Sequence, residues 1–282
     1  MGTYYIDGTF VPAAEAVLPV SDLAVLRGYG VFDFMRTYGG RPFRLGAHVK
    51  RLRNSAQLIG LSCPWSPQEI RDIVEQTLRR NIYPESNVRL LITGGDSDDS
   101  ITPGIQPRLM VMISEVNTYP AHWYTEGVKI ITKDITRFIP GAKSIDYIRA
   151  ILALEEAKAQ GAVESVYVDS QGHILEGTTS NIFVVTAGKV VTPAENILPG
   201  VTRDVVLEIT ASSFKIGLQS VSRKELLMAD EVFLTSSNKE ILPVIQVNDQ
   251  QIGNGAPGKV SRQIMDMFKA YTQGYADKGV VE

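Results

Sequence analysis

The sequence predicts an α+β protein of two domains, with a barrel-like or strongly curved sheet in the second domain. The chain has 282 residues, of which 44% are hydrophobic and 21% charged, as in ordinary globular proteins. A chain of this length suits roughly two domains with full-sized cores. Strand and helix patterns are mixed without regular alternation, and no internal repeat is visible, which favours the α+β class.

The first 117 residues are expected to form a small α/β domain. Residues 3–6 and 9–12 alternate around Asp7-Gly8, a dipeptide that favours a hairpin because it readily adopts positive φ. Apolar residues recur at helical spacing further along. The other elements expected here are a hairpin over residues 31–45, helices over 46–59 and 67–78, and strands over 87–93 and 108–114.

A linker is expected over residues 118–125, followed by a larger domain over 126–282. The helix expected over 145–160 should bury Ile148, Ile151 and Leu152. Other helices are expected over 201–213 and 258–273, and strands over 129–132, 163–169, 182–185, 215–221, 231–235 and 241–247.

Charge and composition exclude several functional classes. Lys and Arg number 28 against 31 Asp and Glu, a net charge of −3, so no basic excess is available for nucleic acid. One cysteine, Cys63, and three scattered histidines exclude a disulfide and a Cys/His metal cluster. No apolar run spans a bilayer, and the first residues lack the regions of a secretory signal. We therefore expect a cytoplasmic enzyme or binding protein without metal, membrane or nucleic-acid partners.

Two residues could carry chemistry. Lys143 stands between Pro140-Gly141 and the start of a helix, although position alone favours an ordinary surface lysine. Glu176 follows two apolar residues and precedes a buried strand, so its carboxylate should lie at the edge of a core and need a partner. A structural salt bridge is the alternative interpretation of Glu176.

A third group of residues could bind an anion. Gly200-Val201-Thr202 precedes a helix, and free backbone N–H groups and the dipole at a helix start suit a phosphate. Ordinary capping by Thr202 would explain the same residues. Residues 235–238, with three hydroxyls and an amide, could complete the anion site or form a simple turn.

Together these features match the requirements of pyridoxal 5′-phosphate: a lysine that forms a Schiff base, a carboxylate for the ring nitrogen and a phosphate site. The residues of these motifs and their order along the chain also resemble those of the class IV, fold-type IV pyridoxal-phosphate aminotransferases. This family includes branched-chain aminotransferases, D-amino-acid transaminases and aminodeoxychorismate lyases. The resemblance extends along the chain from Tyr5-Ile6-Asp7-Gly8 through residues 176–183 to residues 197–203.

The resemblance implies a role for each matching residue. Lys143 would be the Schiff-base lysine and would move the proton between the substrate Cα and the C4′ carbon of the cofactor, while Glu176 would keep the ring nitrogen protonated. Arg51 would bind the phosphate, although the periodicity of its helix alone favours a solvent-facing charge. The other cofactor contacts implied are Val201, Thr202, Ser236 and Ser237 at the phosphate, Leu198 at the ring and Tyr147 near the phenolic oxygen.

The resemblance also bears on substrate and assembly. Asp33 stands where branched-chain aminotransferases usually carry Glu, and Arg27 with Arg89 resembles a less usual D-amino-acid pattern in which two arginines bind the substrate carboxylate. An edge-strand charge is the alternative for Arg89. The implied activity is transfer of an amino group from a D-amino acid or branched-chain amino acid to a 2-oxo acid such as 2-oxoglutarate or pyruvate, by a homodimer. The alternatives are an aminodeoxychorismate lyase and a small-molecule binding protein.

Overall fold

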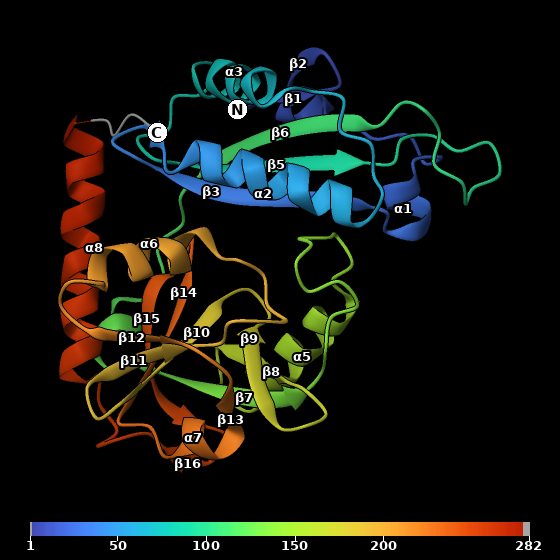
Figure 1. Cartoon of the computed structure of the whole chain (residues 1–282). Coiled ribbons are helices and arrows are strands. Elements are labelled where there is room, and N and C mark those ends of the chain that lie inside the picture. The colour runs from blue at the N-terminus through green and yellow to red at the C-terminus, as the bar shows by residue number, and fades with distance from the viewer. Residues whose placement is uncertain (1, 279–282) are drawn as a thin grey trace. The chain divides into compact units, whose positions relative to one another are not determined.

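In the computed structural model, which describes residues 2–278, the chain forms two compact units (Figure 1). Unit 1 comprises residues 2–117, 141–147 and 273–278, and unit 2 comprises residues 118–140 and 148–272. The segment expected as a linker, 118–125, falls in unit 2, where part of it forms helix α4 (Ala121–Thr125).

Unit 1 is built on an antiparallel sheet with the strand order β2-β1-β6-β5-β3-β4 among the described residues. The first hairpin is confirmed, because its turn residues Asp7 and Gly8 have φ angles of 43° and 95°. The strands are β1 (Thr3–Ile6), β2 (Thr9–Pro12), β3 (Gly30–Tyr38), β4 (Arg41–Pro42), β5 (Ser86–Thr93) and β6 (Arg108–Glu115).

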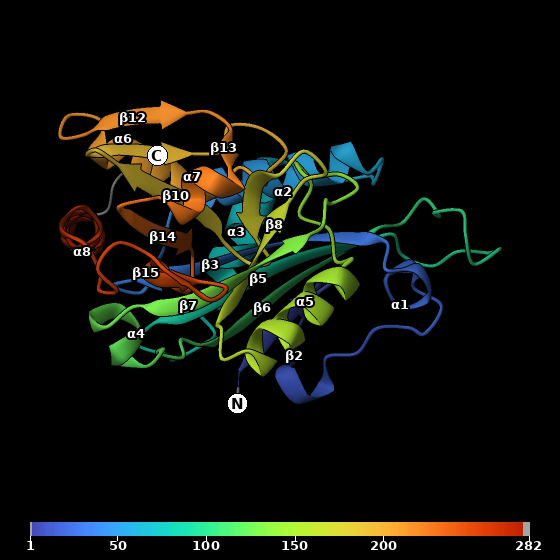
Figure 2. The ribbon, with the colours of Figure 1, turned by 90° about the horizontal axis from the view of Figure 1, so that it is seen from below.

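Helices α2 (Leu45–Leu58) and α3 (Pro67–Leu78) cover one face of this sheet (Figure 2). Their apolar stripes, including Leu52 and Val74, pack on alternate residues of the central strands. Helix α3 begins at a capping box formed by Ser66 and Glu69, with Pro67 in the first turn. Both helices confirm the sequence prediction, whereas the short helices η1 (Ala13–Glu15) and α1 (Leu23–Arg27) were not predicted.

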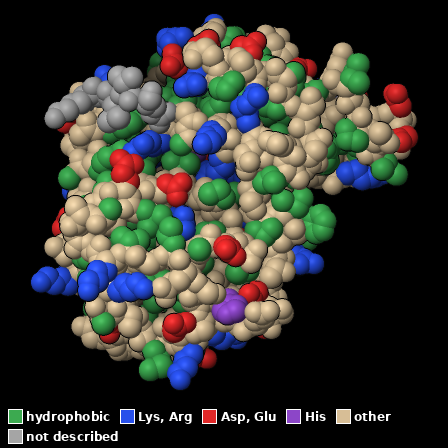
Figure 3. Space-filling view, in the orientation of Figure 1, with side chains coloured by type: hydrophobic (Ala, Val, Ile, Leu, Met, Phe, Trp, Pro, Cys, Tyr) green, Lys and Arg blue, Asp and Glu red, His purple; other side chains and the backbone are tan. Residues whose placement is uncertain are grey.

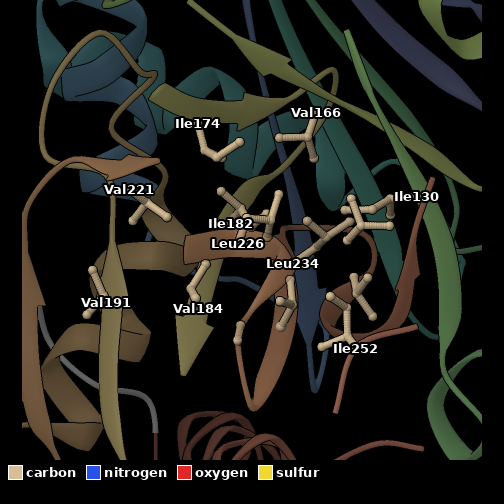
Figure 4. Packing of buried hydrophobic residues seen from close by; sticks show 14 of the residues in the cluster. Ile130, Val166, Ile174, Ile182, Val184, Val191, Val221, Leu226, Leu234 and Ile252 are labelled. Carbon is tan, nitrogen blue, oxygen red and sulfur yellow. The ribbon is translucent and has the colours of Figure 1, made fainter. Parts of the chain in front are cut away.

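Unit 2 contains a mixed sheet that curls around an apolar interior, as the barrel-like prediction requires (Figure 4). Among the described residues its strand order is β12-β11-β10-β14-β15-β7-β8-β9-β13, with β16 paired to β15. Val166, Ile182 and Leu234 belong to the interior cluster. The strands are β7 (Val128–Asp134), β8 (Glu164–Val168), β9 (His173–Gly177), β10 (Asn181–Thr186), β11 (Lys189–Thr192), β12 (Lys215–Leu218), β13 (Val221–Ser222), β14 (Glu231–Ser236), β15 (Glu240–Val247) and β16 (Gln250–Gln251).

The sequence prediction missed the short strands β9 and β11. Polar residues at both ends of β9, including Glu176, hide its alternation. The remaining helices are α5 (Ile148–Ala159), α6 (Val201–Thr210), α7 (Arg223–Leu227) and α8 (Lys259–Lys278). No helix within residues 2–278 is both long enough and apolar enough to cross a membrane. Lys/Arg and Asp/Glu side chains are interspersed on the face shown in Figure 3, in keeping with the net charge of −3.

The predicted burial of the α5 residues Ile148, Ile151 and Leu152 is wrong. Their side chains are 69%, 56% and 64% exposed, and the buried residues of the helix are Ala150, Ala153 and Ala157. Because α5 packs on β7 and β8, small side chains on the inner face allow a close approach that larger residues would prevent. The larger aliphatic residues therefore lie on the outer face of the helix.

Candidate active site

Lys143 is held by its backbone against strand β3 of unit 1. The amide of Phe32 donates to the Lys143 carbonyl at 2.9 Å, and the amide of Ile145 donates to the Gly30 carbonyl at 3.1 Å. The Lys143 amide donates to the Ser55 hydroxyl of α2 at 3.0 Å. Lys143 is half-buried. These contacts fix the backbone of Lys143 and therefore the position from which its side chain starts. An ordinary surface lysine has no such set of contacts.

The ring of Phe32 brings three of the predicted site residues together. The Lys143 ammonium nitrogen lies 4.7 Å from the ring centroid, and the Arg89 guanidinium carbon lies 5.4 Å from it. The ring of Tyr147 meets the same ring edge-on at a centroid distance of 5.5 Å. The amine of Lys143, the cation of Arg89 and the phenol of Tyr147 therefore belong to one cluster in unit 1.

Arg27 lies apart from this cluster in the contacts of the described residues. It is the last residue of α1, which ends at Gly28 with φ of 65°, and its exposed side chain donates to the Leu26 carbonyl at 2.8 Å. None of the contacts within residues 2–278 joins Arg27 to Arg89. Convergence of the two arginines stays a prediction.

Arg51 is buried, so its interpretation as a solvent-facing charge is wrong. Its side chain is 8% exposed and faces Asp33 of β3, with Nε 2.9 Å from Oδ2 and Nη2 2.8 Å from Oδ1. His48 Nδ1 lies 2.7 Å from the same Oδ1. Asp33 and Phe32 are neighbours along β3 and point to opposite faces of the sheet. The sequence analysis did not find the Asp33–His48 contact, although His48 and Arg51 share a helix face at i and i+3.

The charges of this buried cluster are fixed by their surroundings. Burial alone would raise the pKa of Asp33, but the neighbouring Arg51 and His48 lower it well below its usual range. Burial is also the main cause of the lowered pKa of His48, and it outweighs the attraction of Asp33. The cluster therefore pairs an ionised Asp33 with Arg51 and a neutral His48.

Ser55 connects Arg51 to Lys143 within unit 1. Its hydroxyl donates to the Arg51 carbonyl at 2.8 Å and accepts the Lys143 amide. Ser55 is completely buried. The Ser55 hydroxyl therefore joins α2 to the Lys143 segment.

Glu176 lies at the edge of the core of unit 2, as predicted, and is 5% exposed. Its Oε1 accepts from Nε and Nη2 of Arg137 at 2.8 and 2.6 Å, and its Oε2 accepts from the Leu198 amide at 2.9 Å. Both oxygens of the Glu176 carboxylate therefore accept from groups of unit 2, which fixes its orientation. The sequence analysis missed Arg137, which lies 39 residues away along the chain.

The start of α6 lacks the side-chain cap that most helices carry. Its N-cap is Gly200, and no side chain accepts from the first turn, so the interpretation of Thr202 as a cap is wrong. A Cβ at position 200 would lie 1.9 Å from Oδ1 of Asn181, which holds the neighbouring Leu198 carbonyl through its Nδ2 at 2.9 Å. A side chain at position 200 would therefore have to displace the Asn181 amide. The N–H groups of Val201 and Thr202 have no partner inside the helix.

Strand β14 and the turn after it carry the other hydroxyls. Thr235 pairs with Asn181 across the sheet, so the two side chains share a face, and the buried Thr235 hydroxyl has no partner among the described residues. The Ser236 hydroxyl donates to Oδ1 of Asn238 at 2.9 Å and accepts from the Lys239 amide at 3.2 Å. Ser236 and Ser237 are partly exposed.

The comparisons with known proteins decide the family. A model of the amino-transferase class IV family matches residues 30–247. The chain belongs to the class IV aminotransferases. The aminotransferase is 31% identical over 273 residues to a putative branched-chain-amino-acid aminotransferase of Methanocaldococcus jannaschii, with 94% of each chain covered. It is 28% identical over 264 residues to the D-alanine aminotransferase of Bacillus licheniformis, covering 92% of this chain and 93% of the relative.

The fold is shared with solved aminotransferases. The branched-chain amino acid aminotransferase of Escherichia coli is similar with a TM-score of 0.91 and 26% identity, covering 99% of this chain and 97% of that one. Other solved branched-chain aminotransferases of this fold hold pyridoxamine 5′-phosphate or a phosphopyridoxyl adduct. The predicted fold-type IV class is confirmed. The cofactor of the aminotransferase is pyridoxal 5′-phosphate.

The residues of each unit fit this cofactor. In unit 2, the uncapped start of α6, the tight fit around Gly200 and the unpartnered Thr235 hydroxyl suit a phosphate, and the carboxylate of Glu176 suits a protonated ring nitrogen. Unit 1 carries the half-buried Lys143. The roles of the individual residues stay predictions.

Burial of neutral His48 predicts a specific dependence of stability on pH. Below a pH of about 6.5, the unfolded chain binds a proton at this residue that the folded chain resists, so the free energy of unfolding should fall as the pH decreases. The slope from one such proton is at most about 1.4 kcal/mol per pH unit. Urea unfolding between pH 7.5 and 5.5 should therefore show a steeper loss in the wild type than in His48→Gln. The matched variant His122→Gln, at an exposed position, should keep the wild-type dependence; equal slopes in all three proteins would contradict the assignment.

Proposed function

We propose that the chain transfers an amino group between an amino acid, of the D- or branched-chain type, and a 2-oxo acid such as 2-oxoglutarate or pyruvate, with Lys143 as the lysine that forms the Schiff base. The observation that carries this proposal is the cluster around Phe32. It places the Lys143 amine and the Arg89 guanidinium 4.7 and 5.4 Å from one ring centroid. In an α-amino acid the carboxylate is bonded directly to Cα. The enzyme therefore needs an amine that takes the Cα proton and, close to it, a cation that binds the carboxylate.

The chain's own residues have distinct tasks in this proposal. Pyridoxal phosphate supplies the electron sink that makes the substrate Cα acidic. Lys143 takes the proton from Cα, and its backbone bonds to β3 and α2 hold the amine in place. Glu176 holds a proton on the ring nitrogen while Arg137 and the Leu198 amide fix the carboxylate. Arg89 binds the substrate carboxylate.

Further cofactor contacts are proposed by residue type. The α6 amides of Val201 and Thr202 bind the phosphate, and the Thr202 hydroxyl and the turn hydroxyls supply further donors. The proposed phosphate contacts are Arg51, Val201, Thr202, Ser236 and Ser237. Tyr147 would meet the phenolic oxygen of the cofactor, and Leu198 would support the ring. We also propose that the active form is a homodimer.

A substrate panel tests the function as a whole. Purified protein with cofactor is incubated with D- and L-amino acids against pyruvate and 2-oxoglutarate, and the new amino acid is measured. Transfer to either oxo acid is expected, and the preferred enantiomer and side chain identify the substrate type. Pyruvate release from aminodeoxychorismate without any acceptor would instead indicate the lyase, and cofactor binding without turnover would indicate a binding protein.

Borohydride reduction should attach the cofactor covalently to Lys143. Peptide mapping by mass spectrometry should find the label on the peptide that contains this residue. Lys143→Ala should slow transamination by about 10²- to 10⁴-fold, the usual contribution of a general base. Lys158→Ala, at an exposed position of α5, should keep the wild-type rate; a label on another lysine would contradict the assignment.

Glu176→Gln should retain cofactor binding and lose rate. The phosphate contacts still hold the cofactor, but an amide cannot stabilise a protonated ring nitrogen, so removal of the Cα proton should slow by about 10²-fold or more. Stopped-flow absorbance with a single turnover of deuterated substrate measures this step. Glu155→Gln, on the exposed face of α5, is the matched control. A near wild-type rate for Glu176→Gln would exclude the proposed role.

Substituting Arg89 or Arg27 by Leu should raise the KM for amino and 2-oxo acids at least about tenfold, since each loses a charged hydrogen bond to the carboxylate. The absorbance of the bound cofactor should not change. Primary amines without a carboxylate should be affected much less. Arg79→Leu, at the exposed residue that follows α3, serves as the control. Wild-type KM values in both variants, or loss of cofactor from both, would show that these arginines have structural roles.

A further inference from the structure

Unit 2 contains a buried ion pair that none of the roles above uses. The ammonium of Lys239 lies 2.7 Å from Oε2 of Glu164, and the two residues are 7% and 0% exposed. Removal of two charges from water costs free energy that an ion pair alone often fails to recover. The role of this buried pair therefore depends on the groups that it holds in place.

The Glu164 side of the pair shapes the turn after Glu176. Its carboxylate accepts from three consecutive hydroxyls: Thr178 Oγ1 to Oε1, and Thr179 Oγ1 and Ser180 Oγ to Oε2 at 2.7 and 3.2 Å. Gly177 leaves room for this arrangement, because a Cβ there would lie 2.3 Å from the Ser180 hydroxyl and 3.2 Å from Glu164 Cγ. The carboxylate thereby folds residues 177–180 around itself.

The Lys239 side of the pair fixes the turn that follows β14. The Lys239 amide donates to the Ser236 hydroxyl, and its carbonyl accepts from the Tyr124 hydroxyl at 3.2 Å. Nδ2 of Asn238 donates to the Tyr119 hydroxyl at 2.6 Å. The Lys239 ammonium also donates to the Thr179 hydroxyl at 2.8 Å. One side chain therefore ties the turn over residues 236–239 to the turn over residues 177–180.

We propose that Glu164 and Lys239 are positioning residues, which hold the Ser236–Ser237 turn at a fixed distance from the strand that carries Glu176. This inference rests on the proposed function, in which that turn donates to the phosphate and Glu176 meets the ring nitrogen. Because pyridoxal phosphate is a small and largely rigid molecule, donors at its two ends bind best when their spacing is set before binding. The ion pair sets this spacing from a buried position that solvent does not screen.

The test compares two ligands of full-length protein from which the cofactor has been removed. Pyridoxal phosphate reports on both ends of the site, and pyridoxal, which lacks the phosphate, reports on the ring end alone. In Lys239→Met, the Kd for pyridoxal phosphate should rise about tenfold or more, as for loss of a well-placed bond to an anion, while the Kd for pyridoxal stays within about twofold. Unchanged preference for the phosphorylated ligand in this variant overturns the proposal.

Two further variants separate positioning from stability. Lys133→Met removes the ammonium of another ion pair in unit 2, whose Nζ lies 2.6 Å from Oε2 of Glu156 at a partly exposed position, and both Kd values should stay unchanged. If Lys239→Met does not fold, the double variant Glu164→Gln/Lys239→Met has no unpaired buried charge. A purely structural role predicts wild-type ligand preference in the folded double variant, whereas positioning predicts that the preference is still reduced.

Ser237→Ala distinguishes the two levels of inference. If this variant loses preference for the phosphorylated ligand and Lys239→Met retains it, only the positioning role is wrong. If the wild type binds neither ligand, or Ser237→Ala has no effect on the preference, the proposed function of the turn is wrong, and with it the positioning role.

Discussion

The pairing of residues 143–145 with strand β3 is the constraint on which unit 1 depends. It joins two segments more than a hundred residues apart in sequence and makes the Lys143 backbone part of a sheet edge. Phe32 then lies beneath the lysine side chain, and Asp33 points to the other face. Hence two consecutive residues of β3 contact the Lys143 amine and Arg51: Phe32 lies against the amine, and Asp33 is the anion that pairs with Arg51.

Unit 2 is constrained in a different way, because several polar side chains are buried in it and need hydrogen-bond partners. Glu176, Glu164 and Lys239 are buried, and each has several hydrogen-bond partners. Satisfied in this way, buried polar groups restrict the backbone to one arrangement, and a missing partner would be costly. The backbone segments around these residues are therefore held by buried hydrogen bonds.

Much of this organisation was predictable from the sequence. Hairpin turn residues, helix periodicity and the capping sequence before α3 are local signals, and the elements that they predicted are present. Lys143, Glu176 and the start of α6 could be singled out because they lie in motifs that resemble those of the family to which the chain belongs.

The partners Arg137 and Lys239 could not be predicted. Each bonds to a carboxylate far away in the sequence, 39 residues for Arg137 and 75 for Lys239, and no local pattern encodes such a contact. The prediction of the buried face of α5 was wrong for another reason. Hydrophobicity alone ranks isoleucine as more buried than alanine, whereas here the alanines are buried.

The bare N-terminus of α6 has a consequence for stability. A Ser, Thr or Asp cap commonly adds about 0.5–2 kcal/mol to a helix, and such a residue is an easy gain for most proteins. Asn181 opposes such a substitution here, because a side chain at Gly200 would displace the amide that donates to the Leu198 carbonyl. The chain thus lacks an ordinary source of stability at the place where, in the proposed function, the phosphate would accept from the first N–H groups and so complete the hydrogen bonding of the helix.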